Sequence, residues 1–134
     1  MSTVLDIRDV LPSEVEPVRL FLGQNGWGHR TGSAEHFAQL IAHSQRTAIA
    51  VKDSRIVGFA RGITDGLSNG YLSMVVVCEK HRREGVGRAL VEHLMGENSD
   101  ITWVLRAGRE GASEFFAGLG FEVSTIAMER PRSK

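Results

Sequence analysis

A short basic turn with two glycines joins a predicted strand to a predicted helix, and it constrains the fold more than any other feature. The turn Arg82–Gly87 follows the apolar run Leu72–Val77, and a helical pattern begins at Arg88. Glycine lacks the Cβ atom that would keep an anion away from the backbone. The first N–H groups of a helix have no partner within the helix, so they can bind an anion, and the helix dipole adds to the attraction. The sequence therefore predicts an anion site formed by Arg82, Arg83, Gly85, Val86, Gly87 and Arg88; the alternative is a plain turn that needs glycine only for its geometry.

Two stretches resemble one known family. The segment Val77–Leu90, with Arg82-Arg83-Glu84-Gly85-Val86-Gly87 at its centre, resembles the acetyl-CoA signature of the GNAT superfamily of N-acyltransferases. The segment Ala112–Phe121 is similar to the closing motif of the same family. Shorter matches, Gly58-Phe59-Ala60-Arg61, Thr64-Asp65-Gly66 and Val75-Val76-Val77, resemble plant serotonin acetyltransferase-like proteins within it. The resemblance implies an acetyl-CoA-dependent N-acetyltransferase that takes acetyl-CoA as co-substrate.

Length and composition fit one domain over residues 1–134. The formal net charge is zero, which gives no support for a nucleic-acid partner or an anionic membrane surface. Apolar runs are shorter than the roughly 18 residues that a membrane-spanning helix needs. Cys78 is the only cysteine, which suits a reducing compartment, and the five histidines show no metal-ligand spacing. We therefore expect a cytoplasmic protein without a metal site.

Strands and helices alternate along the chain in a way that predicts an α/β layer structure. The fold class implied is a GNAT-type fold, with a mixed, mostly antiparallel central sheet flanked by about four helices. A helix is expected to begin at Ser13, where Ser13 and Glu16 have capping-box spacing, and another is expected after Ser33. A Gly-rich loop is expected at 23–32. Strands are predicted at Leu5–Ile7, Thr47–Val51, Ile56–Ile63, Tyr71–Val77, Ile101–Leu105 and Phe121–Glu129, with a last helix at Ala112–Leu119.

The resemblance assigns further residues to the cofactor. It implies that the backbone of Val75 and Val77 pairs with the pantetheine arm and polarises the thioester carbonyl, between splayed fourth and fifth strands. The familiar tyrosine of the closing motif, which serves as general acid, corresponds to Phe116 here, and the familiar asparagine before it corresponds to Arg109. Phenylalanine has no proton to give. Arg109 is expected either to pair with the cofactor or to lie on the surface.

The general base is the least defined part of the site. The positions at which the family carries a carboxylate or histidine are Tyr71 and Ser73. Neither is a ready base at neutral pH, because a free tyrosine has a pKa of about 10 and serine does not titrate. By strict alternation, positions 71, 73, 75 and 77 share one face of the strand. Tyr71 and Ser73 are then candidates to pass a proton through ordered water, and the alternative is that Tyr71 is a half-buried sheet aromatic.

Three residues are candidates for binding the acceptor. Trp27 and His29 lie in the Gly-rich loop between the first two helices, and Asp65 precedes the fourth strand. Trp27 either covers a bound amine or anchors its loop to the core. We expect transfer of an acetyl group to a small primary amine or amino-acid-like acceptor by direct attack on the thioester. The alternatives are a protein or peptide N-acetyltransferase and a CoA-binding regulatory module with little turnover; a homodimer is a further expectation.

Overall fold

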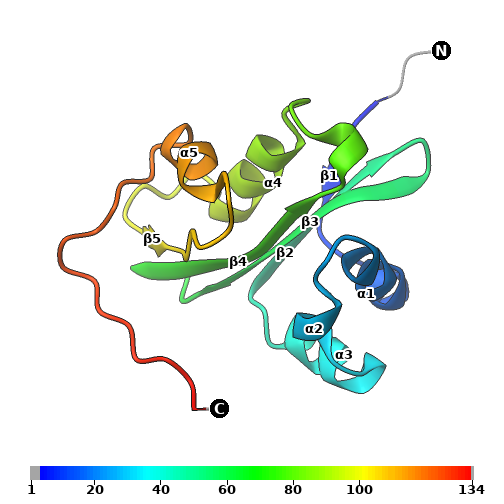
Figure 1. Cartoon of the computed structure of the whole chain (residues 1–134), viewed down its shortest axis with the longest axis horizontal. Helices are drawn as coiled ribbons and strands as arrows, with labels where there is room; N and C mark the ends of the chain where they lie inside the picture. Colours follow the sequence, from blue (N-terminus) through cyan, green and yellow to red (C-terminus); the bar gives the residue numbers. More distant parts are fainter. Residues whose placement is uncertain (1–3, 134) are drawn as a thin grey trace.

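The computed structural model describes residues 4–133 and contains one five-stranded sheet with helices on both faces (Figure 1). The strands lie side by side in sequence order: β1 (Asp6–Arg8), β2 (Arg46–Lys52), β3 (Arg55–Thr64), β4 (Asn69–Val77) and β5 (Thr102–Val104). The first three neighbouring pairs are antiparallel, and β4 and β5 run parallel. The predicted mixed, mostly antiparallel sheet is therefore confirmed.

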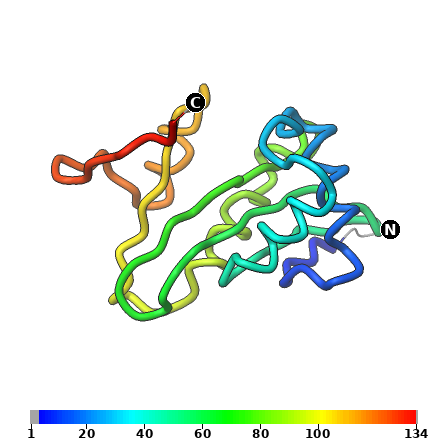
Figure 2. The backbone as a smooth tube through the Cα atoms, turned by 90° about the horizontal axis from the view of Figure 1, so that it is seen from below, coloured from blue at the N-terminus to red at the C-terminus, as the bar shows by residue number. Residues whose placement is uncertain are grey.

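The helices form two layers. On one face lie α1 (Val15–Gln24), α2 (Gly28–Thr31) and α3 (Ala34–Ala42), and on the other lie α4 (Val86–Met95) and α5 (Ala112–Ala117) (Figures 1 and 2). Short 3-10 turns precede α1 at Pro12–Glu14 and α4 at Glu79–His81. About four helices were predicted; the additional one is α2, which occupies part of the loop expected at 23–32.

Each helical layer packs on its own apolar cluster. The α4 cluster contains buried residues from the sheet, from α4 and from α5, namely Ala48, Ala50, Val57, Ala60, Leu72, Val86, Leu90, Val91, Leu94 and Phe116. The α1–α3 cluster contains Val18, Phe21, Leu22, Phe37, Ile49, Phe59, Met74 and Val76. Small residues line the sheet beneath α4 because the helix approaches closely: a Cβ atom at Gly58 would lie 2.8 Å from Leu90.

The start of α1 differs from the prediction, and the start of α3 agrees with it. Ser33 caps α3, because its hydroxyl accepts a hydrogen bond from the N–H of His36 at 3.1 Å. No side-chain cap is present at α1. Instead, the carboxylate of Glu14 accepts the N–H of Leu11 at 2.8 Å and pairs with Arg8 at 2.7 Å. An ion pair with β1 thus replaces the predicted capping box at Ser13.

A β-bulge interrupts β4 in its middle. Phe59 of β3 pairs with Val76, whereas Arg61, two residues further along, pairs with Ser73, so β4 carries one extra residue at this point. Met74 accommodates the bulge with a left-handed backbone, at a φ of 56°. This conformation is uncommon for residues other than glycine, so the bulge is a specific feature of this strand.

The bulge changes which face of the sheet the odd-numbered side chains of β4 point to. Leu72 packs into the α4 cluster, but Met74 packs into the α1–α3 cluster, and Val75 and Val77 turn toward α4. Tyr71 and Ser73 therefore lie on the opposite face from Val75 and Val77. The prediction that positions 71, 73, 75 and 77 share one face was wrong, because strict alternation does not hold across a bulge.

The last predicted strand is not formed. Residues 121–133 have an irregular backbone and run outside the two layers (Figure 2). Val123, Ile126 and Met128 are 92%, 89% and 98% exposed, so their alternating apolar pattern is not buried. A strand needs backbone partners on a neighbouring strand, and β5 offers only three residues at its edge.

Candidate active site

The basic turn leaves the start of α4 open. Gly85, at a φ of 84°, precedes the helix, and no side chain caps the first turn. The backbone at Arg83 is also left-handed, with a φ of 67°. The first N–H groups of α4 therefore have no partner from a capping side chain, and a helix start of this kind favours an anion. The geometry suits the predicted anion site.

The second glycine of the turn has a packing role. Gly87 is buried, and a Cβ atom built on it would lie 2.7 Å from the ring of Phe115 and 3.6 Å from Val77. Glycine at this position thus lets the aromatic ring of α5 lie against the start of α4. Sequence reasoning did not single out Phe115; its only signal was its place beside Phe116 in the closing motif.

The arginines of the turn differ in how they are held. Arg82 donates to the carbonyl of Val77 at 3.2 Å, and Arg88 donates to the carbonyl of Gly118 at 3.1 Å. Arg83 is exposed and forms no ion pair within residues 4–133. Arg82 likewise forms no ion pair in this part of the chain, whereas Arg88 lies 3.8 Å from the carboxylate of Glu92. The charges of Arg82 and Arg83 are therefore available to a ligand, and the side chain of Arg83 is the less restrained of the two.

The carboxylate in the turn is neutralised by its neighbours. Glu84 accepts from His81 and from Lys52 of β2, each at 3.0 Å. These hydrogen bonds, the one from His81 first, lower the pKa of Glu84 below its ordinary value. The turn is thereby tied to the β2–β3 hairpin, and its one acidic group is compensated.

The strands β4 and β5 separate soon after they meet. They pair only from Asn69 to Tyr71 on β4, with Thr102 to Val104 on β5. Beyond Tyr71, β4 keeps β3 on one side and has no strand partner on the other among the described residues. The free side of β4 at Val75 and Val77 therefore has no strand beside it in this part of the chain, although the carbonyl of Val77 already accepts a hydrogen bond from Arg82. The side chains of both valines pack against the α4 cluster.

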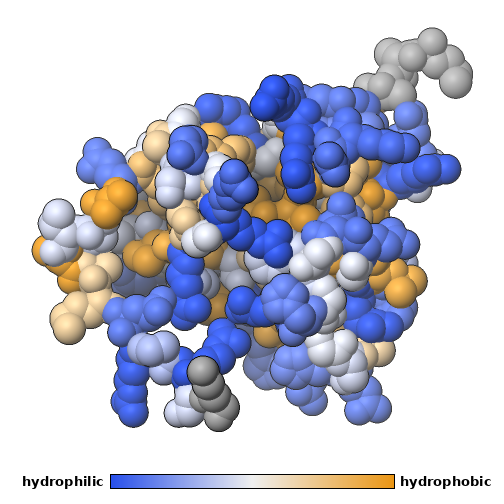
Figure 3. Space-filling view, viewed as in Figure 1, coloured by the Kyte–Doolittle hydropathy of each residue, from blue (hydrophilic) through white to orange (hydrophobic). Residues whose placement is uncertain are grey.

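Tyr71 and Ser73 lie on the face of β4 that carries the α1–α3 layer. Both are half-buried. Ser73 is opposite Arg61 of β3, and Tyr71 is opposite Val104 of β5, which is 43% exposed. The separation of β4 from β5 thus begins at Tyr71. Figure 3, viewed as Figure 1, shows small apolar areas among the polar side chains that lie between the two helical layers.

Arg109, predicted to bind the cofactor, and Trp27, predicted to bind the acceptor, contact each other. The guanidinium of Arg109 lies over the ring of Trp27 at 4.0 Å, and it donates to the carbonyl of Gly26 at 3.3 Å. Trp27 is half-buried and packs against the α1–α3 cluster, which favours the interpretation that it anchors its loop. Its indole N–H is buried and lacks a partner within residues 4–133. His29, on α2, is exposed.

Asp65 is engaged by its own loop. Its carboxylate accepts the backbone N–H groups of Leu67, Ser68 and Asn69 and the hydroxyl of Ser68, at 2.6–3.1 Å. The hydroxyl and then the backbone donors hold the pKa of Asp65 well below its ordinary value. These bonds indicate a structural role in the β3–β4 turn and do not support the predicted contact with an acceptor amine.

Phe116 is buried in the core. Its ring packs edge-on against Phe115, at 4.9 Å between centroids, and against Phe121, at 5.6 Å. The side chain belongs to the α4 cluster, and this burial does not support a contact with the cofactor. Phe115, which is 38% exposed and touches the turn, is the better placed of the two aromatic residues.

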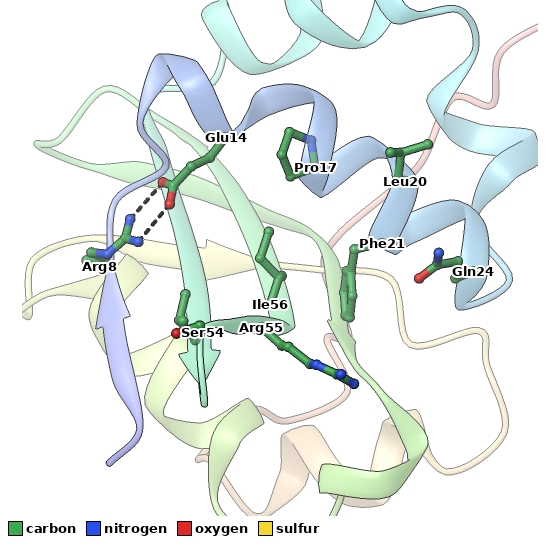
Figure 4. A pocket seen from close by; sticks show the side chains of 10 residues that line it. Arg8, Glu14, Pro17, Leu20, Phe21, Gln24, Ser54, Arg55 and Ile56 are labelled. Carbon is green, nitrogen blue, oxygen red and sulfur yellow. Dashed lines mark hydrogen bonds and ion pairs between the residues drawn. The ribbon is translucent and has the colours of Figure 1, made fainter. Parts of the chain in front are cut away.

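A cavity of about 650 Å³ lies elsewhere, between α1 and the β2–β3 hairpin (Figure 4). Phe21 and Ile56 form its apolar part, and the Arg8–Glu14 pair stands at one side. None of its lining residues comes from β4 or the basic turn, so it is separate from the predicted site. Glu14 neutralises Arg8, whereas Arg55, which also lines the cavity, takes part in no ion pair among the described residues.

The described part of the chain, residues 4–133, lacks two kinds of feature. None of the helices there is long and apolar enough to cross a membrane. The same part of the chain holds no cluster of three or more His, Cys, Asp or Glu side chains that could bind a metal ion.

The chain matches a family model. Residues 43–123 match the acetyltransferase (GNAT) domain. The chain therefore belongs to the GNAT family, whose members are acetyltransferases that generally use acetyl-CoA, and the predicted family and enzyme class are confirmed. A comparison with curated protein sequences finds none that matches significantly. Nothing found supports the narrower resemblance to plant serotonin acetyltransferase-like proteins.

Solved structures with low sequence identity share the fold. A GNAT-family acetyltransferase from Xanthomonas campestris pv. campestris is 23% identical, with a TM-score of 0.78 and coverage of 96% of this chain and 94% of that one. Ribosomal-protein-alanine N-acetyltransferase from Brucella melitensis biovar Abortus is 16% identical, with a TM-score of 0.77 and coverage of 96% and 99%. An aminoglycoside acetyltransferase from an uncultured soil sample is 22% identical, with a TM-score of 0.73 and coverage of 97% and 99%.

Proposed function

We propose that this chain transfers an acetyl group from acetyl-CoA to a small primary amine or amino-acid-like acceptor. The observation that carries the proposal is the free side of β4 beyond Tyr71, which leads to the uncapped start of α4. A ligand with an extended polar arm and a pyrophosphate matches both features, because the arm can pair with a strand and the pyrophosphate with helix N–H groups.

Several residues are suited to hold acetyl-CoA. The backbone N–H groups at Gly85, Val86, Gly87 and Arg88 would face its pyrophosphate, and Arg83 would add a free positive charge. The backbone of Val75 and Val77 would pair with its pantetheine arm. Acetyl-CoA supplies the acetyl group that the acceptor receives. Tyr71 and Ser73, on the other face of the bulge, would orient the amine and accept its proton directly or through water.

Acetyl-CoA binding is tested by thermal unfolding. A ligand at 100 times its dissociation constant stabilises the folded state by about 2.7 kcal/mol, so acetyl-CoA should raise the Tm. Arg83→Glu should weaken binding, because it reverses a free charge of the turn, and Arg132→Glu in the exposed C-terminal segment serves as the matched control. Absence of any shift at millimolar acetyl-CoA would sink the proposal.

Turnover separates an enzyme from a CoA-binding regulatory module. A thiol reagent should detect CoA release that depends on an added amine, whereas a regulatory module would bind acetyl-CoA without releasing CoA. The observation that favours the module is that β4 carries no carboxylate or histidine on either face.

A protein or peptide acceptor is a further candidate, since the structurally similar Brucella enzyme is named for a ribosomal protein. Peptides with a free N-terminus therefore belong in the amine panel.

A homodimer is the proposed assembly. The exposed apolar residues Val123, Ile126 and Met128 and the short edge strand β5 are surfaces that a second copy would cover. Sedimentation at several concentrations would detect it, and Ile126→Asp should shift the equilibrium toward monomer.

The half-buried free thiol of Cys78 is consistent with a reducing compartment, and the cytoplasm is the proposed location.

A further inference from the structure

Arg61 of β3 is a buried cation without an acidic partner. It is 8% exposed, and its one hydrogen bond runs from Nε to the hydroxyl of Ser44 at 2.9 Å. That hydroxyl in turn donates to the carbonyl of Leu40, so no negative charge reaches the guanidinium through it. Within residues 4–133, Arg61 takes part in no ion pair. A buried charge without a counterion is costly, which calls for an explanation.

A second cation makes the imbalance larger. Burial lowers the pKa of the Arg61 guanidinium, nearby Tyr71 opposes this effect, and the charge of Arg30 on α2 lowers the pKa further. Arginine nevertheless stays protonated at neutral pH, so two positive charges lie close together. Asp65, the acid near the end of the same strand, is occupied by its own loop.

The terminal nitrogens of Arg61 can be reached. They form no hydrogen bond within the part of the chain that the structure describes, and the only fully buried side-chain polar atom without a partner there is Nε1 of Trp27. The two terminal nitrogens therefore keep some contact with solvent. Because the side chain is largely buried, an electrostatic contact with these nitrogens is stronger than it would be in water. Because the nitrogens still reach solvent, a ligand can make that contact.

The position of Arg61 relates it to the acceptor. Its neighbour Ala60 belongs to the α4 cluster, so Arg61 points to the other face, which also carries Tyr71 and Ser73. Ser73 is its direct partner across the β3–β4 ladder. A group bound by Arg61 would consequently lie beside the two residues proposed to handle the amine, near the free edge of β4 where the cofactor arm is proposed to pair.

We propose that Arg61, assisted by Arg30, binds a carboxylate on the acceptor, so that the substrates are amines that also carry a carboxylate. This inference rests on the proposed function and narrows it. The planar guanidinium suits a carboxylate because it presents two parallel donors to two oxygens. The anion would supply the missing counter-charge, and its amino group would be directed toward Tyr71 and Ser73.

The test compares amino acids with their carboxamides. The two series differ in the charge and acceptor oxygens of the carboxylate and also in the basicity of the α-amine, so the contact is isolated by comparing the ratio of their kcat/KM values between wild type and each variant at one pH. Loss of a charge-assisted hydrogen bond should change this ratio by roughly 10- to 100-fold. Arg61→Met should lower the ratio by this factor, and Arg30→Met should lower it by less. Ser44→Ala is the matched control, because it removes the hydrogen bond to Arg61 and keeps the charge; its ratio should stay high.

The outcomes separate this inference from the proposed function. If Arg61→Met leaves the ratio of amino acid to carboxamide unchanged, the inference is overturned and the acetyltransferase proposal stands. If Arg61→Met does not fold, Arg61→Lys and Arg30→Met decide by the same ratio. If acetyl-CoA binds but no amine is acetylated, thermal shifts of the acetyl-CoA complex decide instead, measured with amino acids and with carboxamides. A shift that is confined to amino acids and lost in Arg30→Met supports the carboxylate site. Equal shifts with both series, or no shift with either, overturn it.

Discussion

The guanidinium of Arg109 stacks on the indole ring of Trp27 at 4.0 Å. The contact joins the loop that precedes α5 to the loop between α1 and α2, so it links segments that belong to the two helical layers. One of these residues was predicted to contact the cofactor and the other the acceptor. The structure instead brings the two together, and the pair connects the loop between α1 and α2 with the loop between β5 and α5.

A double-mutant cycle measures this contact. Trp27→Leu and Arg109→Met should be non-additive in the free energy of unfolding, with a coupling of about 0.5–1 kcal/mol, as for cation–π pairs near the surface. Urea unfolding of the four proteins supplies the values. A coupling indistinguishable from zero would mean that the stacking is not populated in solution.

Gly87→Ala should destabilise the protein without any ligand. The added Cβ atom would lie 2.7 Å from the ring of Phe115. Overpacking of this kind costs about 1–3 kcal/mol, which exceeds the gain of about 0.5–1 kcal/mol from replacing a helical glycine by alanine. The expected result is a Tm lowered by a few degrees. In a Phe115→Ala background the same substitution should cost less. An equal cost in both backgrounds would show that the ring does not restrict position 87.

Asp65 should make the β3–β4 turn sensitive to acid. Its folded-state pKa is lowered by hydrogen bonds, so it contributes stability above the pKa of about 3.9 of an unfolded aspartate, and this stability is lost as the pH falls below that value. Asp65→Asn should therefore have a lower Tm than wild type at pH 7, and the difference should shrink below about pH 4. A difference in Tm that is constant from pH 7 to pH 3 would contradict this role.

Tyr71→Phe tests the proton path. If the phenol accepts or relays the proton of the acceptor amine, its removal should lower kcat by roughly 100-fold or more. The KM for acetyl-CoA should be unchanged, because the variant removes only the phenol hydroxyl and leaves intact the backbone of β4 that is proposed to pair with the cofactor. Steady-state rates from pH 6 to 9 check both points. A variant with wild-type rate and pH profile would assign Tyr71 to the sheet alone.

The sequence alone was enough for the family and the order of the elements. The turn Arg82–Gly87 and the motif Ala112–Phe121 gave the resemblance, and short apolar runs bounded by turn residues located β2, β3 and β4. Such patterns are local, because a strand–turn–helix unit and a helix cap such as Ser33 depend on residues close together in the chain. The candidate site near the turn depends on the same kind of local pattern, and its residue assignments stay a prediction.

Only the tertiary structure decided the rest. The bulge at Met74 requires β3 as a partner, and it separates Tyr71 from Val77 onto different faces, which alternation along one strand does not reveal. Residues 121–129 have a strand-like pattern but lack a neighbour to pair with. The isolation of Arg61 and the contact between Arg109 and Trp27 depend on segments distant in sequence, whose approach is set by packing of whole layers. Counter-charges and stacking partners are properties of that packing, so no local pattern encodes them.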